Sequence, residues 1–162
     1  MKTTKTIMAI VAIALFSFIF GSCGGGTMSI HSYNEKVIKA FNSALEKMAA
    51  EREIIYENKL SKDENVKLVE GLQKSIDDCT KMMNGLNYPA EAEAFHQQML
   101  EIYNFETETM IPLLSKIVEL EPKSSEWYSV WREFDKQNKT VDQMLKKLGQ
   151  LQSDLQKQAQ KK

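Results

Sequence analysis

The stretch from residue 89 to residue 121, PAEAEAFHQQMLEIYNFETETMIPLLSKIVELE, decides the fold of this chain. Apolar residues recur in it every three or four positions, which is the spacing of one face of an α-helix. They are Phe95, Met99, Ile102, Tyr103, Met110, Leu113, Ile117 and Leu120. Pro89 suits the first turn of this helix, and Pro112 in its interior predicts a kink near Glu108 rather than an end. One apolar stripe of this length needs partner helices to cover it.

Three further segments, residues 28–59, 62–84 and 124–160, show the same helical spacing. Ser61, with a glutamate three residues later, predicts a capping box at the start of the second segment, and Gly85 predicts a left-handed residue past its end. Glycine and proline are too sparse here for the frequent turns of an all-β fold. The sequence therefore predicts an all-α, antiparallel four-helix bundle of up-down-up-down topology. An elongated three-helix arrangement with the second segment loosely docked is the alternative.

The composition excludes several functional classes. The chain has 162 residues, a formal net charge of −1 and two cysteines. Nucleic-acid binding needs a dense basic face, which this charge balance does not supply. Two cysteines are too few for a disulfide scaffold or a cysteine-rich zinc site. The sequence also has no glycine-rich phosphate loop, nucleophile elbow or EF-hand loop. We therefore expect a non-enzymatic protein with no cofactor that does not bind nucleic acid.

The N-terminal segment has the features of an export signal. Lys2 and Lys5 precede an apolar run over residues 7–20. As a helix this run is too short to cross a hydrocarbon core about 30 Å thick. The tetrapeptide FGSC at residues 20–23 resembles the lipobox of bacterial lipoproteins, with phenylalanine where leucine is usual. The resemblance implies cleavage before Cys23, which then carries a diacylglycerol and an acyl chain such as palmitate.

This resemblance divides the chain into a signal peptide at residues 1–22, a lipidated Cys23 with a flexible tether at residues 23–27, and a helical domain at residues 28–162. Two or three acyl chains give stable anchoring in a membrane. Gly24 is not the aspartate that resembles a plasma-membrane retention signal. We therefore expect the outer membrane of a bacterial cell envelope rather than the inner one, and its periplasmic face rather than the cell surface. An ordinary signal peptide with an incidental cysteine is the alternative.

Two blocks of the helical part carry a second resemblance. The sequences YNEKV at residues 33–37 and FHQQMLEIYNFE at residues 95–106 are similar to a family of uncharacterised helical surface lipoproteins of Gram-negative bacteria. These blocks contain no catalytic signature. The resemblance implies a lipid-anchored helical fold and no particular mechanism.

One group of residues is a candidate ligand or metal site. Glu93 and His96 form a Glu-x-x-His pair, one of the two pairs that a dimetal site in a helical bundle requires. Glu106 lies in phase with the apolar stripe, so its carboxylate is predicted to point partly inward. Its candidate partners on neighbouring helices are Lys74, Lys81 and Arg132. A surface histidine and an ion pair at the edge of the seam are the alternatives, and we expect no bound metal.

Other residues have both a structural and a functional interpretation. Asn138 on the seam of the last helix is typical of a buried amide that fixes the register between helices. Cys79 is expected to be a buried thiol, with an intermolecular disulfide as the alternative. Trp127 and Trp131 favour a plug at the end of the core over an aromatic ligand box.

Three hypotheses for function follow. The first is a lipid-anchored, non-enzymatic bundle of the cell envelope that binds a protein or glycan partner. The second is a small-molecule or metal-binding bundle using Glu93, His96 and Glu106. The third is a structural spacer of the envelope.

Overall fold

The computed structural model describes residues 28–160, and this part of the chain is all-helical. The α-helices are α1 (Ile30–Glu57), α2 (Lys62–Asn84), α3 (Glu93–Phe105), α4 (Ile111–Glu119) and α5 (Ser125–Ala159). A 3-10 turn, Ala90–Ala92, precedes α3, and a π-helical segment, Glu106–Met110, joins α3 to α4 without a gap. The predicted third helix is therefore one rod made of α3, the π segment and α4.

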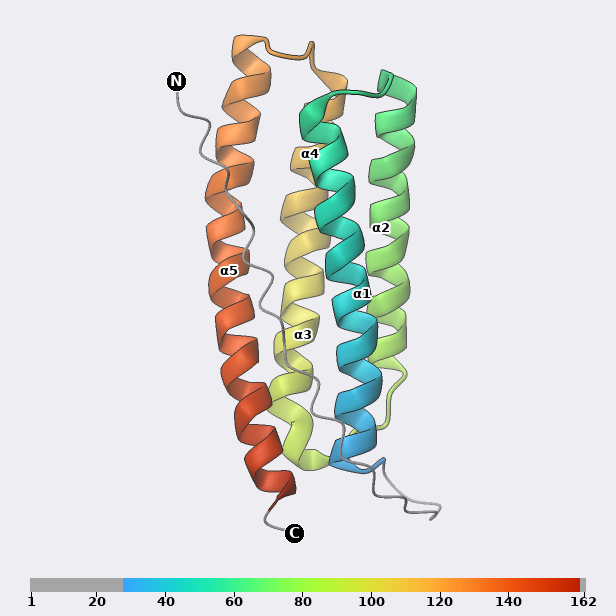
Figure 1. Cartoon of the computed structure of the whole chain (residues 1–162), viewed down its shortest axis with the longest axis vertical. Coiled ribbons are helices and arrows are strands. Elements are labelled where there is room, and N and C mark those ends of the chain that lie inside the picture. The colour runs from blue at the N-terminus through green and yellow to red at the C-terminus, as the bar shows by residue number, and fades with distance from the viewer. Residues whose placement is uncertain (1–27, 161–162) are drawn as a thin grey trace.

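The helices pack side by side along their lengths as a bundle (Figure 1). α2 packs against α1, α3 and α4, and α5 packs against the same three helices. Consequently α1 and the α3–α4 rod face each other across the core, where their side chains meet. The alternative of a loosely docked second segment is wrong, because Leu72, Ile76 and Met83 of α2 are fully buried in this core.

The two ends of the bundle differ in what they hold. The start of α1, in blue, and the end of α5, in red, lie at one end, which we call the terminal end (Figure 1). The connections at residues 58–61 and 120–124 lie at the opposite end, which we call the distal end. The terminal end is therefore the one from which the chain continues toward residue 27.

The apolar stripes predicted from the sequence form the core of the bundle. Its largest fully buried side chains come from all four rods and are Tyr33, Ile38, Phe41, Leu72, Ile76, Met83, Phe95, Met99, Ile102, Tyr103, Met110 and Phe134. Each apolar side chain of this size contributes roughly 1.5–3 kcal/mol on complete burial. The stripes thus supply the main force that holds the four rods together.

The start of α2 confirms the predicted capping box, and its end corrects a prediction. The Ser61 side chain accepts a hydrogen bond from the amide of Glu64, and the Glu64 carboxylate accepts one from the amide of Ser61. Gly85 does not take the predicted left-handed conformation, since its φ is −88°. Its amide instead donates to the carbonyls of the last turn of α2, so the helix closes without a positive φ. The left-handed cap occurs at Asn58, which ends α1 with a φ of 50°.

A π-helical segment lies where Pro112 predicts a kink, around Glu108. Pro112 has no amide hydrogen for the carbonyl of Glu108, and its ring crowds that carbonyl. The turn before it is wider, and the amide of Ile111 donates to the carbonyl of Glu106, five residues back. This extra residue moves the next buried position along by one residue, while Ile117 is buried as predicted. Leu114 is therefore fully buried, whereas Leu113, which the regular spacing predicts, is only half-buried.

The predicted signal peptide at residues 1–22, Cys23 and the tether at residues 23–27 lie outside the described residues. Over residues 28–160, no helix combines the length and the apolar character needed to cross a membrane.

Candidate functional site

The three residues of the predicted ligand site do not come together. Glu93 is exposed at the first position of α3, His96 is buried one turn later, and Glu106 is buried at the start of the π segment. Ten residues of helix separate His96 from Glu106, which is about 15 Å along the axis. Within residues 28–160, no group of histidine, cysteine, aspartate and glutamate side chains is arranged to hold a metal ion.

His96 is part of a buried aromatic cluster near the terminal end, so its interpretation as a surface histidine is wrong. The Tyr33 hydroxyl lies 2.8 Å from Nδ1 of His96, and the Tyr88 ring stacks on the imidazole with 3.9 Å between ring centroids. Phe95 packs edge-on against Tyr33. Burial lowers the pKa of His96 and raises the pKa of Tyr33. Both groups are therefore neutral at pH 7, and we assign the hydroxyl as the donor of this hydrogen bond.

Glu106 is fully buried, and its partner is a residue that the sequence analysis did not name. The Arg52 guanidinium of α1 donates from Nη2 to Oε2 of Glu106 across the core. The expected partners Lys74, Lys81 and Arg132 are not involved. Burial raises the pKa of Glu106, and the charge of Arg52 opposes that rise. Arg52 also lies over the Phe134 ring of α5, with its Cζ atom 5.3 Å from the ring centroid.

Around this ion pair, several buried polar atoms have no hydrogen-bond partner among residues 28–160. They include Oε1 of Glu106, Nε and Nη1 of Arg52, and Oε2 of the adjacent Glu51. An unpaired polar atom in the core costs free energy, so each one needs an explanation. A π segment within an α-helix is also frequent at functional sites. The core therefore gives up stability at this ion pair.

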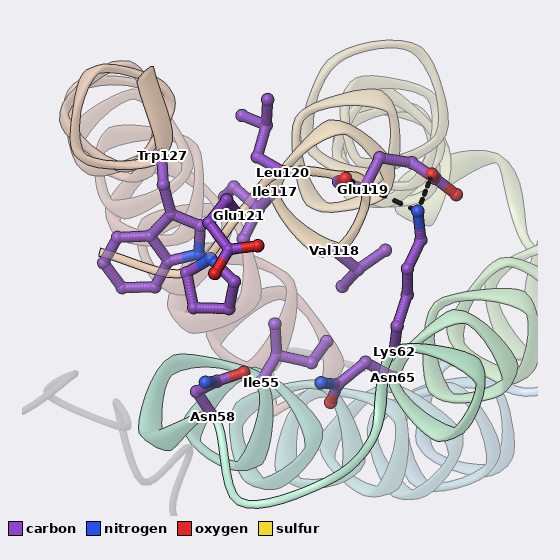
Figure 2. A pocket seen from close by; sticks show the side chains of 11 residues that line it. Ile55, Asn58, Lys62, Asn65, Ile117, Val118, Glu119, Leu120, Glu121 and Trp127 are labelled. Atoms are coloured by element: carbon purple, nitrogen blue, oxygen red, sulfur yellow. Dashed lines mark hydrogen bonds and ion pairs between the residues drawn. The ribbon is translucent and has the colours of Figure 1, made fainter. Parts of the chain in front are cut away.

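A cavity of about 230 Å³ opens at the distal end of the bundle, beyond this ion pair (Figure 2). It lies between the last turns of α1 and α4 and the first turns of α2 and α5. The residues that line it are Ile55, Asn58, Lys62, Asn65, Ile117, Val118, Glu119, Leu120, Glu121, Pro122 and Trp127. We call this cavity the distal pocket. It exists because two helices end and two begin around the same space.

Caps and turns set the positions of the pocket walls. Asn58 stops α1 in a left-handed conformation, and Ser61 starts α2 three residues later. On the other side, Leu120 takes an extended conformation after α4, and Ser124 caps α5 by accepting from the amide of Trp127. These short connections bring the indole of Trp127 to the pocket from one wall and the Asn58 amide from the other (Figure 2).

The polar wall of the distal pocket contains one amide that is not fully paired. Asn65 is only 4% exposed, and its Nδ2 atom donates to the carbonyl of Leu60 at 3.4 Å. Its Oδ1 atom is buried and has no hydrogen-bond donor within the described part of the chain. Next to it, the Lys62 ammonium bridges α2 to α4 through the Glu119 carboxylate, as the dashed lines in Figure 2 show. Asn65 thus belongs to the pocket wall, and its own side-chain oxygen is enclosed and unpaired.

Aromatic rings surround the distal pocket on its α5 side. Tyr56 of α1 is 56% exposed and stacks on Trp127, and its ring meets Trp131 edge-on. Tyr128 is 50% exposed and contacts Trp127 edge-on. Trp127 and Trp131 are buried, as expected for a plug at the end of the core. Trp127 also lines the pocket, so the plug forms one of its walls.

The two remaining candidates lie away from this pocket. Asn138 is half-buried, and its Oδ1 atom is enclosed with no partner among residues 28–160. Cys79 is a free thiol and is half-buried rather than fully buried, because it lies at the edge of the α2 stripe.

Sequence reasoning missed Arg52 and the pocket for different reasons. Arg52 lies between Met48 and Ile55 at helical spacing, so the spacing alone predicts that it is buried. Sequence reasoning passed over it because a charged residue is rarely part of a core. His96 likewise precedes Met99 by three residues on the stripe. The pocket has no such signal, because it depends on how two connections fold beside each other.

Comparisons of this chain with models of protein families, with curated proteins and with solved structures give no match.

Proposed function

We propose that this chain is a lipid-anchored protein of the bacterial cell envelope and that its helical bundle is a non-enzymatic binding module. The observation that carries the binding role is the distal pocket, an open cavity at the end of the bundle that apolar side chains and the amides of Asn58 and Asn65 line. A concave site with apolar walls and a few polar groups is the usual form of a ligand-binding site. The exposed Tyr56 ring beside the pocket adds contact area of the kind found at binding sites.

The bundle is proposed to be antiparallel, with up-down-up-down topology. Two contacts support this arrangement. Lys62 at the start of α2 pairs with Glu119 at the end of α4. Near the other end of α1, Tyr33 meets His96, which lies close to the start of α3. Short connections between consecutive helices favour the same topology.

The anchor is proposed to be the lipidated Cys23, which resembles the cysteine of a lipobox. In this arrangement the terminal end of the bundle lies next to the membrane. α1 has 28 residues, and a helix of that length rises about 42 Å. The distal pocket then faces away from the membrane, where a protein or glycan partner can reach it. We propose the outer membrane as the site of anchoring, with the bundle on its periplasmic face.

The anchor is tested by metabolic labelling with a radioactive or clickable palmitate in a bacterial host. The intact chain is expected to incorporate label and to sediment with membranes. The Cys23→Ser variant is expected to lose both properties, while Cys79→Ser, the matched control at the other cysteine, keeps both. Incorporation of label into Cys23→Ser would contradict the proposed anchor.

The binding role is tested by photo-crosslinking in intact cells. A photoreactive phenylalanine analogue replaces Tyr56 at the rim of the pocket, and the same analogue replaces the exposed Lys157 near the terminal end as a control. We expect a discrete adduct from position 56 and none from position 157. No adduct from position 56, or equal adducts from both positions, would contradict a binding site at the distal end.

A further inference from the structure

The side chains that line the distal pocket divide into two groups by burial and charge. The buried apolar ones are Ile55, Ile117, Val118 and Trp127. The charged ones are all exposed, and they are Lys62, Glu119 and Glu121. A side chain that lines the cavity and is also exposed lies where the cavity opens to solvent. The pocket therefore offers apolar contacts inside and charged groups at its mouth.

The charges at the mouth of the distal pocket do not balance. The Lys62 ammonium pairs with Oε2 of Glu119, so these two charges neutralise each other (Figure 2). The side chain of Glu121 has no ion pair and no hydrogen bond within residues 28–160. The lining therefore carries one uncompensated negative charge, which attracts a cation and repels an anion.

The backbone at the end of α4 brings a second carboxylate to the same mouth. Leu120 takes an extended conformation, in which side chains two positions apart point to the same side of the chain. Its neighbours Glu119 and Glu121 accordingly both line the pocket. The bridge from Lys62 uses Oε2 of Glu119 and leaves Oε1 outside the ion pair. A cation at the mouth therefore meets oxygens that no other cation holds.

The volume and the apolar inner wall determine which kind of cation fits. The pocket measures about 230 Å³, below the roughly 300–1,000 Å³ of sites for drug-sized ligands. A bare metal ion gains nothing from apolar walls, and residues 28–160 contain no group of acidic, histidine or cysteine side chains arranged to hold one. Lysine and arginine side chains bury an apolar stem while the charged head stays near water. One such side chain matches the pocket in size, polarity and charge.

The exposed aromatic rings beside the distal pocket favour a basic side chain that belongs to a protein over a free amine. Tyr56 stacks on Trp127, and Tyr128 contacts the same indole edge-on. Both tyrosines are at least half exposed. Tyrosine is enriched in the contact surfaces between proteins. A free amine that fills the pocket is too small to cover these rings, whereas the residues around a partner's lysine or arginine can do so.

We propose that the distal pocket binds a lysine or arginine side chain of a protein partner. The stem of this side chain packs against the apolar inner wall, and its charge lies beside Glu121. The partner's neighbouring residues contact Tyr56 and Tyr128. This inference rests on the proposed binding role of the distal end and selects a protein rather than a glycan as the partner.

The test is a titration of the full chain in phospholipid nanodiscs with short glycine-rich peptides, followed by tryptophan fluorescence. The central residue of the peptide is lysine, arginine, norleucine or glutamate, and n-butylamine is the free-amine probe. We expect saturation with the lysine or the arginine peptide, at a lower concentration than with n-butylamine. We expect none with the norleucine or glutamate peptide. Added salt is expected to weaken the binding, because the carboxylates at the mouth are exposed.

Variants of the charged mouth assign the binding to the pocket. Glu121→Gln is expected to weaken binding of the basic peptide about two- to fivefold, as loss of one exposed ion pair does. Glu121→Lys reverses the charge and is expected to abolish binding. Glu126→Gln and Glu126→Lys are the matched controls, since Glu126 is exposed at the start of α5 and does not line the pocket. Both positions are on the surface, so these variants keep the fold.

Variants of the aromatic residues locate the signal and the protein contact. Trp127→Phe is expected to remove the fluorescence change, whereas Trp131→Phe keeps it, because only Trp127 lines the pocket. Tyr56→Ala is expected to weaken binding of the basic peptide and to leave n-butylamine binding unchanged. The second result separates a contact with the partner's neighbouring residues from a change in the pocket itself.

The outcomes separate this inference from the proposed function. Equal binding of the norleucine and lysine peptides, or binding of a basic peptide that Glu121→Lys leaves unchanged, overturns the cation site. Binding of n-butylamine as tight as that of the basic peptides overturns the assignment to a protein partner. No binding of either basic peptide, together with an adduct from position 56 in cells, overturns the inference while the binding role stands. Absence of both signals overturns the inference and the proposed function together.

Discussion

The two buried polar pairs of the core differ in charge and in how completely their atoms are paired. Near the terminal end, Tyr33 and His96 are neutral and share a hydrogen bond under the stacked ring of Tyr88. Toward the distal end, Arg52 and Glu106 form an ion pair that leaves three of their own polar atoms unpaired. A well-packed apolar pair is often as stable as a buried ion pair or more stable. The comparison therefore indicates that the Arg52–Glu106 pair is kept for a reason other than stability.

The other buried atoms without a hydrogen-bond partner among residues 28–160 lie along the whole bundle. Toward the terminal end they are the side-chain amide oxygens of Asn34 and Gln98 and the hydroxyl of Tyr103. Toward the distal end they include the carboxylate of Glu51, the indole nitrogen of Trp131 and the side-chain oxygen of Asn65, a residue that lines the pocket. Proteins commonly give up stability where they bind ligands. Buried unpaired atoms next to the distal pocket are therefore compatible with the binding role that we propose for the distal end.

Breaking the ion pair is expected to have the largest effect. Arg52→Met leaves the buried Glu106 carboxylate without a cation and lowers the free energy of unfolding by about 3–5 kcal/mol. The measurement is urea denaturation followed by circular dichroism. Arg132→Met, at an exposed arginine of α5, is the matched control and changes the free energy by less than about 0.5 kcal/mol. Equal losses in the two variants would contradict the role assigned to Arg52.

Removing both charges of the Arg52–Glu106 pair separates the cost of an unpaired charge from the contribution of the pair itself. Arg52→Met combined with Glu106→Leu is expected to recover about 3 kcal/mol relative to Arg52→Met alone, because no uncompensated charge remains in the core. Urea denaturation of the two single variants and the double variant gives the coupling free energy. A double variant no more stable than Arg52→Met would show that the pair is needed for packing and not only for function.

The neutral pair is expected to contribute less. Tyr33→Phe keeps the aromatic packing and removes the donor to Nδ1 of His96, at a cost of about 1–3 kcal/mol in the free energy of unfolding. Tyr128→Phe removes a hydroxyl from an exposed ring and serves as the control, with a change near zero. A loss for Tyr33→Phe larger than that for Arg52→Met would reverse the order of the two regions.

The smallest expected effect is on the pH dependence of the free energy of unfolding, to which His96 and Glu106 contribute in opposite directions. Because burial lowers the pKa of His96, the unfolded chain takes up a proton first as the pH falls through 6.5, and the fold loses stability below that pH. Because burial raises the pKa of Glu106, the folded chain takes up a proton first as the pH falls toward 4.5, and this adds stability. We expect His96→Gln to reduce the decrease in the free energy of unfolding at acid pH and Glu106→Gln to increase that decrease. Parallel pH profiles of these variants would contradict the assignment.

The regular parts of the fold were predictable from the sequence, and the irregular parts were not. The capping box at Ser61 placed the start of α2 correctly, because it depends on residues three positions apart. The stripe of the third rod was correct up to Met110 and at Ile117, but Leu114 takes the place predicted for Leu113, because the π segment changes the helical phase. Gly85 was misassigned because glycine permits a left-handed conformation without requiring one.

The candidate site was predictable only in part. The inward position of Glu106 followed from its phase on the stripe, whereas its partner depends on how α1 and the α3–α4 rod face each other. Asn65 precedes Val69 by four positions on the buried stripe of α2, but a polar residue at the start of a helix is rarely counted as core. Contacts between segments far apart in the chain decide such features, and helical periodicity does not encode them.

The most direct test of this account is the yield of the photo-adduct from position 56 in cells, measured with Asn65 and with Asn65→Leu. The account holds that Asn65 is part of the binding wall of the distal pocket and is kept there at the expense of stability. It predicts that Asn65→Leu unfolds at the same urea concentration as the parent chain or a higher one, while the adduct falls to background. An undiminished adduct in a folded Asn65→Leu protein would contradict it.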